Sequence, residues 1–161
     1  MKSFIIIFLS AILVLPSFAQ RPVQPSDVYR LKSVNDAQIS PDGKWIAYVV
    51  SSPDSAKDKY DSDIWMISWD GKDNVQLTSS PESESAPRWS SDGKYLTFLS
   101  SRYEAKTSQI WRMDRRGGEA SKLTDLKVSI NDYEWSPDAK KIVLVIKDQD
   151  PVESEDKKKT K

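Results

Sequence analysis

One turn-and-strand unit occurs three times in this chain, and that repetition constrains the fold more than any other feature. The segment SPDGKWIAYV begins at Ser40, returns as SSDGKYLTFL from Ser90 and returns again as SPDAKKIVLV from Ser136. The Ile-Trp pair at Ile64 and the Leu-Thr pair at Leu77 each recur 46 residues later. A fixed period of about 40–50 residues is typical of β-propeller blades, but helical repeats share it. The chemistry of the segments must therefore decide between the two.

Each unit consists of short β-like runs separated by turn residues. In the second unit these runs are about 86–90, 94–100, 108–114 and 119–124, and in the third they are about 131–136 and 140–147. The second run is apolar on both faces, so it must be covered on both sides. A sheet stacked between neighbouring blades meets this need, and a core strand of an ordinary β-sandwich is the alternative. The regular period favours the propeller.

Turn residues join these runs. Pro41 presets its backbone, Asp42 can cap the turn, and Gly43 tolerates a positive φ. Ala139 stands where the third unit needs that glycine, so we expect a strained turn or one of another type. The first unit is four residues longer than the second, and the extra residues fall in the polar stretch 51–63.

The sequence thus predicts an all-β fold: a partial β-propeller of about two and a half four-stranded blades after a signal peptide. We expect a signal peptide at 1–19, an N-terminal lead-in at 20–34, blade 1 at 35–80, blade 2 at 81–126, and an incomplete blade 3 with a charged loop at 127–161. Closed propellers need about 4–8 blades. We therefore expect the remaining blades in a longer protein; the alternative is a ring assembled from several fragments.

The first residues have the layout of a secretory signal peptide. Lys2 precedes an apolar run from Phe4 to Leu15, and the small-x-small triplet that ends at Ala19 follows. An uncleaved anchor is the alternative, but the run is shorter than the ~20 residues of a spanning helix. The chain has no cysteine. We expect cleavage near Ala19, no stable membrane span afterwards, and export to a bacterial periplasm.

Composition excludes several classes of function. The chain has 24 basic and 24 acidic residues, so a broad positively charged surface that binds nucleic acid is not expected. Histidine is absent as well as cysteine, which removes a Ser-His-Asp triad, thiol nucleophiles and the usual zinc ligands from these residues. No Gly-rich phosphate loop and no G-x-S-x-G elbow occurs. We predict no catalytic, cofactor-binding or metal residue within this sequence, and no cofactor.

Carboxylates are the remaining candidates. Asp58, Asp61 and Asp63 cluster in the longer part of the first unit and could hold calcium, but their spacing does not fit the twelve-residue calcium loop. Glu82 and Glu84 could meet the amino-terminal group of a peptide. A solvated loop and a solubilising surface are the ordinary interpretations, and we favour them.

The six tryptophans and one arginine have ordinary explanations too. Five tryptophans are expected to pack between sheets, because four recur at equivalent positions and one lies in the first apolar strand. They are Trp45, Trp65, Trp89, Trp111 and Trp135. Trp69 precedes the hairpin pair Asp70-Gly71 and is the one most expected to be exposed. Arg102 follows a strand, and a structural ion pair is the favoured role.

Taken together, SPDGKWIAYVVSS, DSDIWMISWDG, APRWSSDGKYLTFLSSR, QIWRMDRRGGEASKLT and WSPDAKKIVLVI resemble the amino-terminal propeller of the prolyl oligopeptidase family. The bacterial dipeptidyl-peptidase and acylaminoacyl-peptidase-like branch is the most similar. The resemblance covers essentially all of the chain after the signal peptide. TolB-like periplasmic propellers and propeller–amidohydrolase fusions carry similar Ser-Pro-Asp-Gly repeats.

The resemblance implies a propeller that restricts access of short peptides to an α/β-hydrolase domain with a Ser-Asp-His triad. That domain lies outside this sequence, so no triad residue is carried over. The role of amino-terminal recognition is not transferred to Glu82 or Glu84, because the flanking residues do not match. The implied function is the non-catalytic, gating portion of a secreted serine exopeptidase. A TolB-like periplasmic protein-binding propeller and an amidohydrolase fusion are the alternatives.

Overall fold

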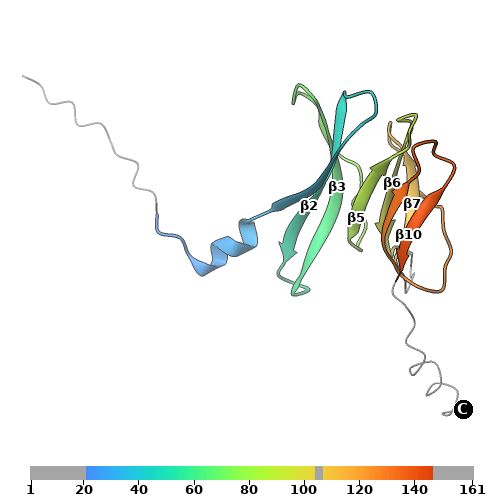
Figure 1. The fold of residues 1–161 in the computed structure, drawn as a ribbon. Coiled ribbons are helices and arrows are strands. Elements are labelled where there is room, and N and C mark those ends of the chain that lie inside the picture. The colour runs from blue at the N-terminus through green and yellow to red at the C-terminus, as the bar shows by residue number, and fades with distance from the viewer. Residues whose placement is uncertain (1–20, 104–106, 147–161) are drawn as a thin grey trace, which may run out of the picture.

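The computed structural model describes residues 21–103 and 107–146, which form antiparallel sheets that stand side by side (Figure 1). The elements are helix η1 (Pro25–Arg30), a 3-10 helix, and strands β1 (Ser33–Ile39), β2 (Trp45–Asp54), β3 (Lys59–Ser68), β4 (Asn74–Gln76), β5 (Glu84–Trp89), β6 (Tyr95–Ser100), β7 (Gln109–Asp114), β8 (Ser121–Lys122), β9 (Ile130–Trp135) and β10 (Ile142–Ile146). The predicted signal peptide and the charged loop after residue 146 lie outside the described residues.

The strands pair in the order in which they follow one another along the chain. One four-stranded sheet has the order β1-β2-β3-β4, a second has the order β5-β6-β7-β8, and β9 pairs with β10 in a two-stranded sheet. All these pairs are antiparallel. We call the three sheets blades 1, 2 and 3. The predicted all-β partial propeller is confirmed, and a helical repeat is excluded for the described residues.

The repeated turn is built by side chains within the motif itself. Gly43 N donates to Ser40 O at 2.8 Å, and the Ser40 hydroxyl donates to Asp42 Oδ1 at 2.7 Å. In the third copy Ala139 N donates to Ser136 O at the same 2.8 Å, and Ala139 has a φ of +53°. The turn is therefore of the same type in all three copies. The expected backbone strain is present, because Ala139 adopts the left-handed conformation that glycine adopts in the other two copies.

Two apolar clusters fill the spaces between neighbouring blades. The first joins blades 1 and 2 through Ala47, Ile64, Met66, Trp89, Leu96, Phe98, Trp111 and Met113. The second joins blades 2 and 3 through Leu99, Ile110, Ile130 and Tyr133. The indole N–H groups at these seams are paired, since Trp89 Nε1 donates to Gln38 O at 2.9 Å and Trp135 Nε1 donates to Thr97 Oγ1 at 3.0 Å. Strand β6, which is apolar on both faces, is thus covered on both faces, whereas β10 leaves Val143 and Val145 exposed.

The first strands of the three blades converge. Arg88 on β5 forms ion pairs with Asp36 on β1 and with Asp132 and Glu134 on β9. Strands β1 and β5 each contain a register irregularity just before this level, and the irregular segments hold Asp36 and Ala86 at φ of +47° and +50°. A bulge of this kind bends a strand and re-aims its side chains. The first strands are therefore the inner strands of the partial propeller.

Candidate functional site

Connections of two kinds lie at opposite ends of the blades. Because successive strands are antiparallel, the first-to-second and third-to-fourth connections share one end, and all other connections share the opposite end. The first end carries the repeated short turns. The other end, which we call the loop face, carries helix η1 and the segments 55–58, 77–83, 101–103, 107–108 and 123–129. Loops vary more easily than tight turns, so the loop face is where the blades can differ in function.

One hairpin on the loop face is longer than its counterpart. In blade 2 the ladder between β6 and β7 ends at the pair Ser100–Gln109. In blade 1 the ladder between β2 and β3 passes the equivalent pair Val50–Asp63 and continues to Asp54–Lys59. We call residues 51–62 the hairpin arm. The prediction that the extra residues of the first unit fall within 51–63 is confirmed.

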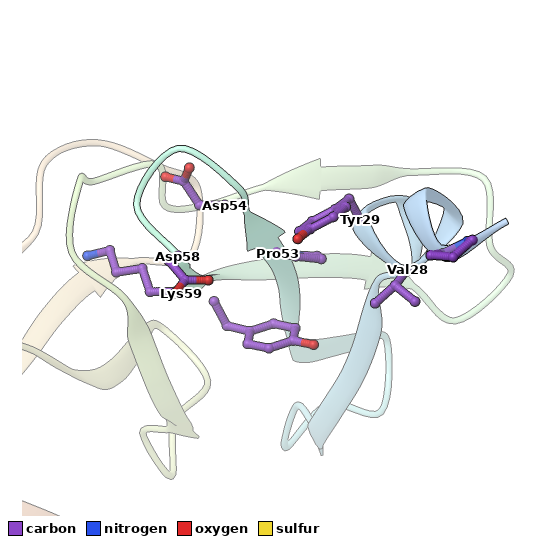
Figure 2. Close-up of a pocket in the computed structure, with 8 residues that line it drawn as sticks. Val28, Tyr29, Pro53, Asp54, Asp58 and Lys59 are labelled. Carbon is purple, nitrogen blue, oxygen red and sulfur yellow. The ribbon is translucent and has the colours of Figure 1, made fainter.

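A pocket of about 320 Å³ lies between the hairpin arm and helix η1. Figure 2 shows Val28 and Tyr29 on the helix side and Pro53 at the arm. The full lining is Pro25, Val28, Tyr29, Pro53, Asp54, Asp58, Lys59 and Tyr60. Tyr29 is 58% exposed and Tyr60 is 62% exposed. Large aromatic side chains left in solvent around a hollow indicate a contact surface.

A buried ion pair lies below the loop face. Glu84 is fully buried, and its Oε1 atom accepts hydrogen bonds from Arg102 Nη2 at 2.8 Å, Ser100 Oγ at 3.1 Å and Ser80 Oγ at 2.5 Å. The Arg102 guanidinium also lies 5.0 Å from the centroid of the Phe98 ring. Glu84 Oε2 has no hydrogen-bond partner among the described residues. One oxygen of this carboxylate is thus fully engaged while the other lacks a donor.

Asp63 lies at the base of the hairpin arm, near this pair. Its Oδ2 atom accepts a hydrogen bond from Gln76 Nε2 at 3.0 Å, and Thr78 Oγ1 lies 3.5 Å from its Oδ1 atom. Partial burial, followed by the negative charges of Glu84 and Asp61, raises the pKa of Asp63 to about 6. A carboxylate with such a pKa exchanges protons in the mildly acidic range.

The three aspartates considered for calcium do not form such a site. No cluster of three or more histidine, cysteine, aspartate or glutamate side chains that could hold a metal ion exists within residues 21–103 and 107–146. Asp58 is exposed near the tip of the arm, whereas Asp63 is partly buried at its base. The interpretation as a solvated loop is therefore right for Asp58 and wrong for Asp63, because β3 carries Asp63 into the seam between blades.

The two glutamates considered for peptide recognition differ from each other. Glu82 is exposed, as a solubilising residue would be, but Glu84 is fully buried. The surface interpretation is thus wrong for Glu84, because it is the first residue of an inner strand and its partners come from the loop side. Its buried carboxylate already engages Arg102, so it is not presented to an incoming amino group. The structural ion pair favoured for Arg102 is confirmed.

The tryptophans follow the predicted division except Trp65, which is only partly buried and belongs to neither inter-blade cluster of the described residues. Trp69 is 66% exposed. Trp89 and Trp111 are buried, and Trp45, Trp65 and Trp135 are partly buried. Trp69 lies on the end opposite the loop face, beside the hairpin between β3 and β4.

Sequence reasoning missed helix η1 and the pocket beside it. A signal was present, because Pro25 occupies the first turn and Asp27 Oδ2 accepts from Gln24 N at 2.8 Å, a common pattern at a helix start. The pocket itself had no signal of its own, since it needs the helix and the arm to be placed together. No helix in the described part of the chain is long and apolar enough to cross a membrane.

Comparison with known proteins agrees with this geometry. The profile of the TolB beta propeller domain family matches residues 23–160. A Bacillus subtilis protein named Uncharacterized peptidase YuxL is 36% identical over 138 residues, which cover 86% of this chain and 21% of that protein. Dipeptidyl-peptidase 5 of Porphyromonas gingivalis is 36% identical over 114 residues, which cover 71% of this chain and 16% of that protein.

A solved acylaminoacyl peptidase, in complex with Z-Gly-Gly-Phe-chloromethyl ketone, has the same fold. It matches with a TM-score of 0.60 and 26% identity, over 72% of this chain and 18% of that chain. The chain thus spans about a fifth of the length of the curated relatives that it matches. The resemblance to the amino-terminal propellers of prolyl oligopeptidase-family peptidases is confirmed. The chain belongs to the TolB β-propeller domain family, and its sequence relatives in that family carry peptidase names.

Proposed function

We propose that this chain is the non-catalytic, substrate-gating propeller portion of a secreted serine exopeptidase that cleaves short peptides. The observation that carries the proposal is the match, over most of the chain, to the propellers of proteins named as peptidases. The Ser-Asp-His hydrolase domain would be supplied by sequence beyond these residues. Peptide substrates are the partners of the complete enzyme, and neither a cofactor nor nucleic acid has a role.

The loop face suggests how gating would work. The hairpin arm and helix η1 enclose a pocket with exposed Tyr29 and Tyr60, and such amphipathic rings contact peptides at little entropic cost. A pocket of about 460 Å³ also lies at the opposite end, beside the turn residues 115–118, but Trp69 is not among its lining residues. We place the peptide-contacting surface on the loop face because the pocket there is bordered by two exposed aromatic rings and by longer connections, which vary more easily than tight turns.

The first experiment assays the complete gene product and the isolated residues 20–161 on chromogenic dipeptides. We expect turnover by the complete product that a serine-directed inhibitor abolishes, and no turnover by the isolated residues. A complete product without a G-x-S-x-G segment followed by an aspartate and a histidine would refute the proposal.

A second experiment tests the loop face in the complete enzyme. The double variant Tyr29→Ala/Tyr60→Ala should raise KM for longer peptides several-fold and leave kcat for a dipeptide unchanged, because the rings bind parts of the substrate remote from the scissile bond. Trp69→Ala is the matched control, since it removes an equally exposed ring from the opposite end. Equal effects of the two changes would argue against a gating loop face.

Export to the periplasm, with signal cleavage near Ala19, is part of the same proposal. It is tested by the amino-terminal sequence of the protein recovered from the periplasmic fraction, which should begin at Gln20. The second candidate function is a TolB-like periplasmic protein-binding propeller, which the family match itself favours. That function predicts a complete product that ends with the propeller or a small partner domain and has no peptidase activity.

A further inference from the structure

The repeat allows the two seams between blades to be compared position by position. At the seam of blades 1 and 2, Ile64 N donates to Thr78 Oγ1 at 2.8 Å. At the seam of blades 2 and 3, Ile110 N donates to Thr124 Oγ1 at 3.0 Å. The serines Ser83 and Ser129 likewise each accept from a backbone N–H at 3.2 Å. The two seams thus share one backbone framework, and differences between them lie in the side chains.

At the seam of blades 2 and 3, an uncharged amide holds the connecting segment. Gln109 is fully buried, and its Nε2 atom donates to the carbonyls of Leu126 and Val128, both at 3.0 Å. Its Oε1 atom accepts from Leu126 N at 2.8 Å and from Thr124 Oγ1 at 2.9 Å. The side chain supplies both the donors and the acceptor that the connection needs.

At the seam of blades 1 and 2, carboxylates occupy the equivalent positions. Asp63 stands where blade 2 has Gln109, and Glu84 stands where the next inner strand has Ile130. An ionised aspartate accepts hydrogen bonds but cannot donate them, so it cannot donate to backbone carbonyl groups as Gln109 does. Replacing an amide and an alkyl group by two carboxylates at a seam is costly unless a proton or a cation compensates.

The charges around Asp63 do not balance. Asp61 precedes it by two residues on the same strand, and Ser83, the residue before Glu84, bonds to Ser62 N and to Asp61 Oδ1, which brings the start of β5 beside this part of β3. The cation at this seam, Arg102, bonds to Glu84 Oε1 and Ser100 Oγ and not to Asp63. Glu84 Oε2, which is fully buried, has no donor among the described residues. A proton on Asp63 would offset this excess of negative charge.

We propose that Asp63 and Glu84 form a pH-sensitive latch at the seam of blades 1 and 2, closed when Asp63 carries a proton and loosened when Asp63 is ionised. The proton turns Asp63 from an acceptor into a donor and removes its repulsion of Glu84. This inference depends on the fold and not on the proposed function.

The direction of the effect follows from linkage. The folded-state pKa of Asp63, about 6, lies above the ordinary value of 3.8. Stability from this group is therefore fully present below the ordinary value and is lost as pH rises through about 6. This dependence is opposite to that of the aspartates in the repeated turns, whose pKa values are lowered.

The test uses Asp63→Gln, which installs in blade 1 the residue that blade 2 carries. Carboxyl NMR of the full chain should show a resonance, absent from the variant, whose midpoint lies at least about one pH unit above that of an ordinary aspartate. The midpoint of urea unfolding of the unmodified chain should fall between about pH 5 and about pH 7.5, and this fall should be absent from Asp63→Gln.

Asp61→Asn is the control, because it removes a neighbouring charge and leaves the latch in place. It should lower the titration midpoint of Asp63 and keep a pH-dependent unfolding midpoint. An Asp63 resonance with an ordinary midpoint, or equal pH dependence in the unmodified chain and Asp63→Gln, would overturn the latch. A titration midpoint that moves on addition of millimolar calcium would also overturn it, by assigning the site to a cation. If Asp63→Gln does not fold, the titration of the unmodified chain decides.

Discussion

Arg88 Nη1 lies 3.0 Å from Oδ2 and 3.1 Å from Oδ1 of Asp36, so a guanidinium of blade 2 holds both oxygens of a carboxylate of blade 1. The same side chain reaches Glu134 through Nε at 3.2 Å and Asp132 through Nη2 at 3.4 Å. Its side chain is only 14% exposed. One arginine thus connects the inner strands of all three blades in the described structure, where the strand backbones of different blades form no ladder.

Replacement of this arginine should destabilise the chain. Arg88→Met keeps most of the apolar stem and leaves three carboxylates without their common cation, so we expect a loss of about 2 kcal/mol in the free energy of unfolding. Arg116→Met is the control, because Arg116 forms an exposed ion pair with Asp114, and loss of such a pair has little effect on stability. Urea denaturation measures both, and similar losses would show that the inner ion pairs do not connect the blades.

The Glu84–Arg102 pair should behave as a coupled unit. Arg102→Met leaves a buried carboxylate unpaired, which costs about 3 kcal/mol. In the double variant Glu84→Gln/Arg102→Met the unpaired charge is gone, so the loss should be at least about 1 kcal/mol smaller than the sum of the single losses. A double-mutant cycle by urea denaturation gives this coupling directly. Additive losses would mean that the two residues act independently.

The left-handed positions of the repeated turns predict a pair of opposite effects. Ala139→Gly should stabilise the chain by about 0.5–1 kcal/mol, because the relief of a positive φ exceeds the entropy that glycine adds to the unfolded state. Gly93→Ala should destabilise it by a similar amount, since its φ is +66° and an added Cβ meets only an ordinary contact with Pro41 at 3.5 Å. Thermal unfolding measures both. Changes of the same sign would contradict a shared turn geometry.

The hydroxyl in each turn predicts an acid response. The Ser90 hydroxyl donates to Asp92 Oδ1 at 2.6 Å and, together with the N–H of Lys94, holds the pKa of Asp92 below its ordinary value. A lowered pKa contributes stability above the ordinary value of about 4 and loses it as pH falls. Ser90→Ala should therefore raise the pKa of Asp92 and weaken the acid dependence of unfolding. Carboxyl NMR checks this, with Asp138 in the third turn as the unchanged reference.

Much of the fold could be predicted because its determinants are local. The apolar runs predicted at about 94–100 and 108–114 became β6 and β7, nearly residue for residue. The turn at Ser40 is closed by atoms of residues that follow within five positions, so a short motif specifies it. Such elements can be read from one copy and checked against the next.

The seam chemistry could not be predicted because it depends on partners far apart in the chain. Glu84 occurs in a serine-rich segment typical of a solvated loop. It is buried because it begins strand β5 and because Arg102, later in the chain, pairs with it. Asp63 likewise reads as one of several loop aspartates. Comparison with Gln109 at the equivalent position could have marked it, because a repeat that exchanges an amide for an acid departs from its own pattern.

The turn that begins at Ser40 draws most of its hydrogen bonds from residues 40–45. Trp69 N, which donates to Lys44 O within the same blade, and Arg115, which reaches Asp42 from blade 2, supply the others. A gene segment that encodes one blade therefore also encodes most of the turn between its first two strands. Duplication or loss of such a segment preserves these turns in the other copies, so propellers with different numbers of blades can arise from one ancestral unit.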